Sequence, residues 1–111
     1  MLKKLILGLA LCLVLVRGQG SNPSGNAQIY HNQVAVTGTA TALSAQPLKT
    51  FCIKALHANA IAIYIGNSGV TTSNGMELIA DQSWCGNIDD AKRIYVVAST
   101  TGASASWIGT N

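Results

Sequence analysis

The sequence has little charge and few aromatic side chains. Of its 111 residues, 10% are charged and six are aromatic. The basic excess is confined to the start: Lys3, Lys4 and Arg17 are three of the seven basic residues, and the four acidic residues balance the other four. A neutral body cannot build a basic surface, so we expect no nucleic-acid partner. Because 49% of the residues are hydrophobic, the chain can bury a core, and its length allows one domain.

The sequence also lacks the motifs of common catalytic and metal sites. His31 and His57 are isolated, without the spacing of a metal-binding pair. The segment Gly66–Val70 resembles a serine nucleophile motif but ends in valine where that motif needs glycine. Asp89 and Asp90 stand outside any calcium-loop pattern, and no glycine-rich phosphate loop is present. We expect no catalytic residue, no metal and no cofactor, and therefore no enzyme.

The first twenty residues have the pattern of an export signal. Lys3 and Lys4 precede the twelve-residue apolar run Leu5–Val16. As a helix, this run would extend only about 18 Å, short of the roughly 30 Å hydrocarbon core of a membrane. We expect a hydrophobic leader helix in residues 1–20, acting either as a signal peptide or as an uncleaved anchor with membrane contact through residues 1–16. Residues 21–27 then form a linker, and residues 28–111 form a single β domain.

In the body of the chain, apolar residues alternate with polar ones, and helical periodicity is nearly absent. Alternation of this kind is typical of half-buried strands. Two segments are helical candidates. Ala40–Leu48 is weakened by Pro47 and is better interpreted as a connection, and Asn87–Lys92 is barely one turn long. Gly38 suggests a bulge, and Asn74 with Gly75 suggests a turn at positive φ. We therefore predict an all-β fold, a small antiparallel sandwich or barrel of jelly-roll type. The expected extended segments are Val34–Ala42, Leu48–His57, Asn59–Ile65, Met76–Ala80, Arg93–Ser99 and Ala103–Ile108.

Two cysteines, Cys52 and Cys85, remain in the body of the chain. Export implies an oxidising destination, and two cysteines allow one internal pairing. Such a bond would close a long loop in the unfolded chain and stabilise a small domain by roughly 3 to 4 kcal/mol. We expect the disulfide, with two buried free thiols as the alternative.

One stretch of the sequence resembles a known class of proteins. After a strand ending in Y-I-G (Tyr64–Gly66), the chain reads G-V-T-T-S-N-G (Gly69–Gly75), and a Thr/Ala-rich strand (Val34–Leu43) precedes it. A closing Y-x-V-A-S strand (Tyr95–Ser99) follows. The pattern, covering about Val34 to Ile108, resembles small all-β virion proteins of bacteriophages, such as head-decoration and fibre modules. It implies a structural protein of the virion surface, or of a membrane-containing virion or a secreted relative, given the leader.

The resemblance implies self-association or binding to a major capsid protein, with attachment to a cell-surface glycan as a secondary role. The exposed polar side chains of Thr71, Thr72, Ser73 and Asn74 would form an interaction edge; the alternative is that they only make a turn. If a glycan binds, Tyr64, Trp84 and Trp107 are the natural stacking platforms; otherwise these rings belong to the core. The competing function is an exported carbohydrate-binding or adhesin-like β module.

Overall fold

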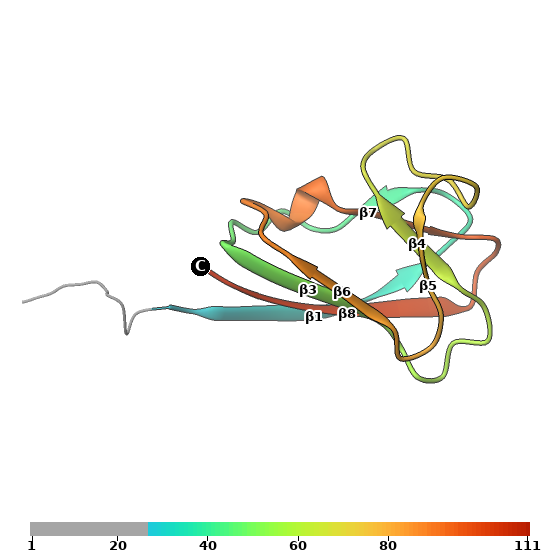
Figure 1. Cartoon of the computed structure of the whole chain (residues 1–111), viewed down its shortest axis with the longest axis horizontal. Helices are drawn as coiled ribbons and strands as arrows, with labels where there is room; N and C mark the ends of the chain where they lie inside the picture. The colour runs from blue at the N-terminus through green and yellow to red at the C-terminus, as the bar shows by residue number, and fades with distance from the viewer. Residues whose placement is uncertain (1–26) are drawn as a thin grey trace, which may run out of the picture.

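The computed structural model describes residues 27–111, which form eight β-strands and one short 3-10 helix (Figure 1). The expected leader, and the linker up to residue 26, lie outside these residues. The elements are β1 (Ile29–Val36), β2 (Thr41–Ala42), β3 (Thr50–Ala55), β4 (Ile63–Gly66), β5 (Met76–Leu78), β6 (Ser83–Gly86), η2 (Ala91–Arg93), β7 (Tyr95–Ala98) and β8 (Ala103–Thr110).

The strands form two antiparallel sheets of four strands each. The first, called sheet 1, has the order β1-β8-β3-β6, and the second, sheet 2, has the order β2-β7-β4-β5. Apart from the β4–β5 hairpin, every connection carries the chain from one sheet to the other. This alternation is the topology of an eight-stranded jelly roll. The prediction of an all-β protein with two antiparallel sheets is confirmed.

The core lies between the two sheets and follows from alternation along the strands. In β3, Phe51, Ile53 and Ala55 are buried, whereas the residues between them face outward. Phe51 packs against Trp107 of β8 at a ring-centroid distance of 5.8 Å and against Trp84 of β6 at 6.4 Å. Small and branched side chains from both sheets fill the rest of the core. In a strand such as β3 only one face is apolar, which is why its period predicted it.

The first predicted strand needs a correction. The expected continuous segment Val34–Ala42, with a bulge at Gly38, is instead two strands in different sheets. β1 begins five residues earlier, at Ile29, and ends at Val36. Residues 37–40 then cross to sheet 2, where the carbonyl of Thr37 accepts a hydrogen bond from the N–H of Ala98 at 2.8 Å. Threonine hydroxyls hold the crossing: Thr37 Oγ1 accepts from the Thr39 N–H at 3.2 Å.

A second difference is β6, which the sequence analysis did not identify. It is four residues long and pairs with β3, with Cys85 directly opposite Cys52. The two cysteines form a disulfide bond across the outer face of sheet 1, with their Cα atoms 4.1 Å apart. The bond predicted from the two cysteines is therefore present, and it joins an edge strand to its only neighbour in the sheet.

The disulfide should account for much of the domain's stability, since it closes a sequence separation of 33 residues. Replacing both cysteines (Cys52→Ala with Cys85→Ala) should lower the free energy of unfolding by about 3 to 4 kcal/mol, measured by urea denaturation. A reductant should destabilise the wild-type protein to a similar extent and leave the double variant unchanged. A loss below about 1 kcal/mol would show that the disulfide constrains the unfolded chain less than its loop length predicts.

The connection between β2 and β3 is joined to the connection between β6 and β7 by Asp90. Its carboxylate accepts hydrogen bonds from the N–H of Gln46 at 2.9 Å and of Lys92 at 3.0 Å, and Asp90 is the N-cap of η2. These bonds from Lys92 and Gln46 lower the pKa of Asp90 below its usual value. Of the helical candidate Asn87–Lys92, only the single 3-10 turn Ala91–Arg93 forms, with Asp90 as its cap.

Asp90→Ala should lower the melting temperature at pH 7 by roughly 4 to 8 °C, because two backbone N–H groups lose their acceptor. A carboxyl group with a depressed pKa stabilises the fold above its unfolded pKa, near 3.9, and this stabilisation is lost as the pH falls through the folded value. The difference between variant and wild type should therefore shrink in acid. Asp89→Ala, whose carboxylate pairs with the exposed Arg93, is the matched control and should have a smaller effect. A larger loss for Asp89→Ala would contradict this assignment.

Candidate functional site

β1 is the longest edge strand in the described part of the chain. β1 pairs with β8 along its whole length, from Ile29 opposite Thr110 to Val36 opposite Ala103, and no strand within residues 27–111 lies on its other side. The carbonyl of Gln28 accepts from Asn111, so the even-numbered residues direct their backbone groups to β8. The backbone N–H and C=O groups of the odd-numbered residues (Ile29, His31, Gln33 and Ala35) therefore point away from the sheet.

This edge has none of the features that usually block strand pairing. Natural edge strands are protected by lysine or other charges, by proline, by bulges or by being short. β1 has eight residues and contains no proline, lysine, arginine, aspartate or glutamate. The opposite edge of the same sheet, β6, has four residues and is tied down by the disulfide. The edges of sheet 2, β2 and β5, have two and three residues. Among residues 27–111, β1 thus offers the longest unprotected edge.

Beside this edge, the outer face of sheet 1 contains a shallow hollow of about 820 Å³. Its apolar centre is the disulfide together with Ile108, whose side chain is about half exposed. Polar side chains surround this centre; they include His31, Gln33 and Lys54. His31 and Gln33 belong to β1, so the hollow and the free edge form one continuous surface.

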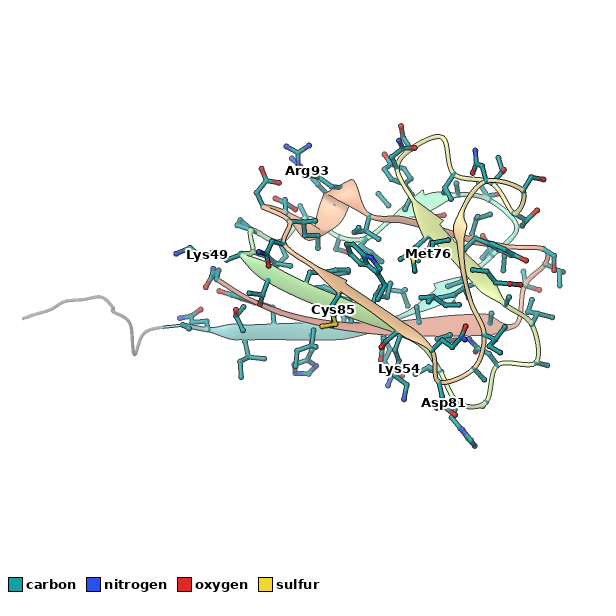
Figure 2. All side chains as sticks on the ribbon, in the orientation of Figure 1. Lys49, Lys54, Met76, Asp81, Cys85 and Arg93 are labelled. Atoms are coloured by element: carbon teal, nitrogen blue, oxygen red, sulfur yellow. A yellow bond between two sulfur atoms is a disulfide. The ribbon has the colours of Figure 1, made fainter. Side chains whose placement is uncertain are left out.

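The charged groups nearest to the hollow are already paired. Lys54 Nζ lies 3.4 Å from Asp81 Oδ1, and His57 Nδ1 lies 2.5 Å from Asp81 Oδ2. Figure 2 shows Lys54 and Asp81 close to each other, beside the start of β6. The hydrogen bond from His57, followed by the pairing with Lys54, lowers the pKa of Asp81. Asp81 has a φ of 70°. Its N–H donates to the carbonyl of Ala55, and the N–H of Ala55 donates to the carbonyl of Gln82. Two residues thus face one residue of β3, which is a β-bulge at the start of β6.

The predicted interaction edge, Thr71–Asn74, lies in the exposed loop between β4 and β5. Two of its four side chains are used within the loop itself. Asn74 Oδ1 accepts from the Thr71 N–H at 2.7 Å, and Thr71 Oγ1 accepts from the N–H groups of Ser73 and Asn74 at 3.2 and 3.3 Å. Thr72 and Ser73 remain exposed, with no side-chain hydrogen bond in the loop. The structure thus places these residues on the surface, in a loop that holds its own shape.

The loop is anchored to the outer face of sheet 2 by Val70, which is 6% exposed. The expected positive φ at Asn74 and Gly75 is wrong, since in residues 27–111 positive φ occurs only at Asp81 and Gly102. Position 75 requires glycine because there is no room for a Cβ atom, and not because its backbone has a positive φ. A Cβ atom there would lie 2.7 Å from Tyr64 Cβ and 2.7 Å from Val70 Cγ2.

Gly75→Ala should therefore lower the free energy of unfolding by about 1 to 3 kcal/mol, since the added methyl group overpacks the contact with Tyr64 and Val70. Gly69→Ala is the matched control in the same loop. Its new Cβ would come no nearer than 3.5 Å to a neighbouring atom, so the free energy of unfolding should change by less than about 0.5 kcal/mol. Denaturant unfolding of both variants measures the difference, and equal effects would show that the loop does not clamp onto sheet 2.

The three candidate stacking residues do not lie together. Trp107 is 6% exposed and belongs to the core, and Trp84 is partly buried against that core from the side of β6. Tyr64 lies on the outer face of sheet 2, opposite Glu77. The Tyr64 hydroxyl donates a hydrogen bond to the Glu77 carboxylate at 3.3 Å. Both tryptophans therefore contact the core, as the alternative to glycan stacking assumed. The structure does not bring the three rings to one surface.

The sequence analysis did not identify the β1 edge as a functional surface. A signal was present in the segment Ile29–Val36, eight residues without charge or proline and with apolar side chains at Tyr30, Val34 and Val36 on one face. The pattern was missed because His31, Asn32 and Gln33 interrupt the alternation. Edge position itself depends on the neighbouring strands, which periodicity does not specify.

Within residues 27–111, no helix is long and apolar enough to cross a membrane, and no three histidine, cysteine or acidic side chains gather as a metal site would require.

No protein-family model matches the chain, and no curated protein matches its sequence. Among solved structures, the chain is similar to a protein of Bacillus endospore appendages, which are described as a novel family of disulfide-linked pili. The identity is 14%, the match covers 85% of this chain and 98% of that chain, and the TM-score is 0.32. This weak neighbour is a protein of a surface structure, but a likeness at this TM-score does not establish a shared function.

Proposed function

We propose that the protein is a non-catalytic structural module that assembles with copies of itself through the free edge of β1. The observation that carries this proposal is the edge itself: eight residues without charge or proline, with the backbone groups of four residues directed outward.

Strand pairing with another copy would give these outward N–H and C=O groups hydrogen-bond partners, as β8 does for the backbone groups on the other side of β1. An intermolecular pair adds a strand to an existing sheet, and its main-chain hydrogen bonds supply affinity without any special side chain. The cost of removing water from this edge is low, because no charged side chain of β1 has to be desolvated. The adjoining hollow, with Ile108 and the disulfide at its centre, adds apolar surface next to the same edge.

At a finer level, we propose that the assembly is a virion surface, with the protein acting as a decoration or fibre-like module of a bacteriophage. This step relies on the sequence resemblance around Gly69–Gly75. A major capsid protein is then a second partner, and the leader in residues 1–20 implies that the protein is exported or associated with a membrane. The jelly-roll topology is compatible with this role, since capsid proteins use it; lectin domains use it as well.

The alternative is an exported carbohydrate-binding or adhesin-like module. The inward positions of Trp84 and Trp107 weaken this alternative, because a glycan needs an accessible ring face. Tyr64 and the exposed Thr72 and Ser73 remain as its candidate contacts. A protein that stays monomeric and binds glycans in titration would support the alternative.

A proline substitution tests the assembly edge. Because the N–H of His31 points away from β8, His31→Pro should leave the fold intact and remove an intermolecular donor. Sedimentation of the full chain should show self-association weakened at least about tenfold, the equivalent of roughly 1.4 kcal/mol. Ser83→Pro is the matched control, because it places proline at the outward position of the opposite edge of sheet 1, on β6.

Three results contradict the proposal. One is a wild-type protein that stays monomeric at high concentration. Another is association that His31→Pro leaves unchanged, and the third is association that Ser83→Pro weakens equally. Circular dichroism of each variant shows whether the fold is intact, so that loss of association is not confused with unfolding.

A further inference from the structure

We infer that the partner of the β1 edge is the β1 edge of a second copy, paired antiparallel about a two-fold axis at Asn32. This inference rests on the proposed function and specifies its geometry. It follows from the lengths of the available edges, from the residues that this register places opposite one another, and from a hydrogen bond at the centre of the strand.

The lengths of the free edges leave β1 with one suitable partner among them. A copy of this domain offers four free edges in residues 27–111, and the edges other than β1 have two, three and four residues. Pairing β1 with any of these would leave at least half of its outward backbone groups without a partner. Only another β1, with eight residues, can cover the edge over most of its length. An edge that pairs with itself gives a two-fold symmetric dimer.

The direction of the backbone groups restricts the register of a β1–β1 pair. The odd-numbered residues carry the outward N–H and C=O groups, so they must face odd-numbered residues of the second copy. With the axis at Asn32, Ile29 lies opposite Ala35 of the second copy, and His31 lies opposite Gln33. On the outer face, apolar residues therefore meet apolar ones, and polar residues meet polar ones.

The other face of the strand is matched in the same register. Tyr30 lies opposite Val34 of the second copy, and both residues are partly buried against the core in a single copy. Asn32 lies opposite its own counterpart, where two amide groups can hydrogen-bond to each other. An aromatic residue opposite a β-branched one is among the favourable cross-strand pairs. The segment Ile29–Ala35 is thus symmetric in chemical character about its central residue on both faces.

Neighbouring registers lose this match. Moving the axis to His31 places Ile29 opposite Gln33 and Tyr30 opposite Asn32, and fewer residues of the strand overlap. Moving it to Gln33 places His31 opposite Ala35 and Asn32 opposite Val34. Each shift sets apolar side chains against polar ones, so the register centred on Asn32 is the one that the side chains favour.

A local hydrogen bond occupies the centre of the edge in the single copy. Asn32 Oδ1 accepts from the N–H of Gln33 at 2.9 Å. This N–H is one of the outward donors, and in the dimer the carbonyl of His31 from the second copy would accept from it. Since the bond is exposed and joins neighbouring residues, exchanging it for an intermolecular bond costs little.

The dimer would be a continuous sheet of eight strands, with two β1 strands at its centre. A two-fold axis perpendicular to a sheet keeps equivalent faces on the same side. The two outer hollows would therefore open to the same side, with His31 and Gln33 of both copies between them. The short edges formed by β6 would become the ends of the sheet, each closed by its disulfide.

The test is cysteine crosslinking at the axis. In the proposed register position 32 faces itself in a pair that is not hydrogen-bonded, where Cα atoms are about 4.5 Å apart. The native Cys52–Cys85 bond spans a similar distance of 4.1 Å in an equivalent pair. Asn32→Cys in the full chain, with Cys12→Ser to remove the thiol of the leader, should form disulfide-linked dimers under mild oxidation. Peptide mapping should show the bond at position 32 and the native disulfide intact.

Ala35→Cys, in the same background, is the matched control on the same edge. Its two thiols would be six residues apart along the strand, about 20 Å, so it should crosslink at least about tenfold more slowly. Because Ile29 faces position 35, Ile29→Cys and Ala35→Cys should crosslink with each other when mixed. This mixture also tests the register if Asn32→Cys does not fold.

The outcomes separate this inference from the proposed function. Preferential crosslinking at position 32, with a wild-type protein that sediments as a closed dimer, supports both. Open polymers weakened by His31→Pro, with no preference for position 32, overturn the symmetric pairing and leave assembly through β1 standing. Equal crosslinking of Asn32→Cys and Ala35→Cys overturns the register. A monomer that does not crosslink overturns both.

Discussion

The contact of Phe51 with Trp84 and Trp107 is the interaction on which the rest of the structure depends. These three rings come from neighbouring strands of sheet 1, so their contact fixes which face of the sheet is buried. Because side chains alternate along a strand, the parity set by Phe51 places Cys52 and Lys54 on the outer face. Because β8 pairs with β3 and β1 pairs with β8 in a fixed register, the side chains of His31 and Gln33 lie on that same face. The backbone groups of these two residues point to the free edge. The core contact thus determines both the position of the disulfide and the chemistry of the edge.

A two-sheet sandwich leaves edges that a closed barrel would not have. In this protein the four edge strands differ in length and in how they are protected. β2, β5 and β6 are too short to offer more than a few hydrogen bonds, and a covalent bond holds β6 to β3. β1 is long because β8, its only neighbour, runs the full length of the sheet beside it. The usual means of protecting such an edge, charge or proline, are absent from it. In a chain whose charged side chains lie elsewhere, this difference makes β1 the edge that the proposed assembly would use.

The sequence predicted the parts of the structure that depend on local alternation. The extended segment Leu48–His57 was predicted because Phe51, Ile53 and Ala55 recur with a period of two. β6 was missed because a four-residue strand that ends in glycine carries too few alternating positions to be distinguished from a turn. Gly75 was assigned a positive φ from its Asn-Gly context, whereas its actual constraint is the space taken by Tyr64 and Val70, which belong to other parts of the chain. The candidate edge was missed for the same reason, since the neighbours of a strand are set by tertiary structure.

The low charge of the domain has a consequence for how an assembly could achieve specificity. Interfaces rich in lysine and glutamate select partners by charge complementarity, but β1 has no such groups to use. Backbone hydrogen bonds alone would allow pairing with any extended strand, in any register in which the outward N–H and C=O groups of the two strands face each other. Selectivity must therefore come from the side chains opposite one another, and in β1 these change from apolar to polar and back within seven residues. A strand with this pattern penalises a shifted register and favours its own copy, so a neutral edge can be specific without being charged.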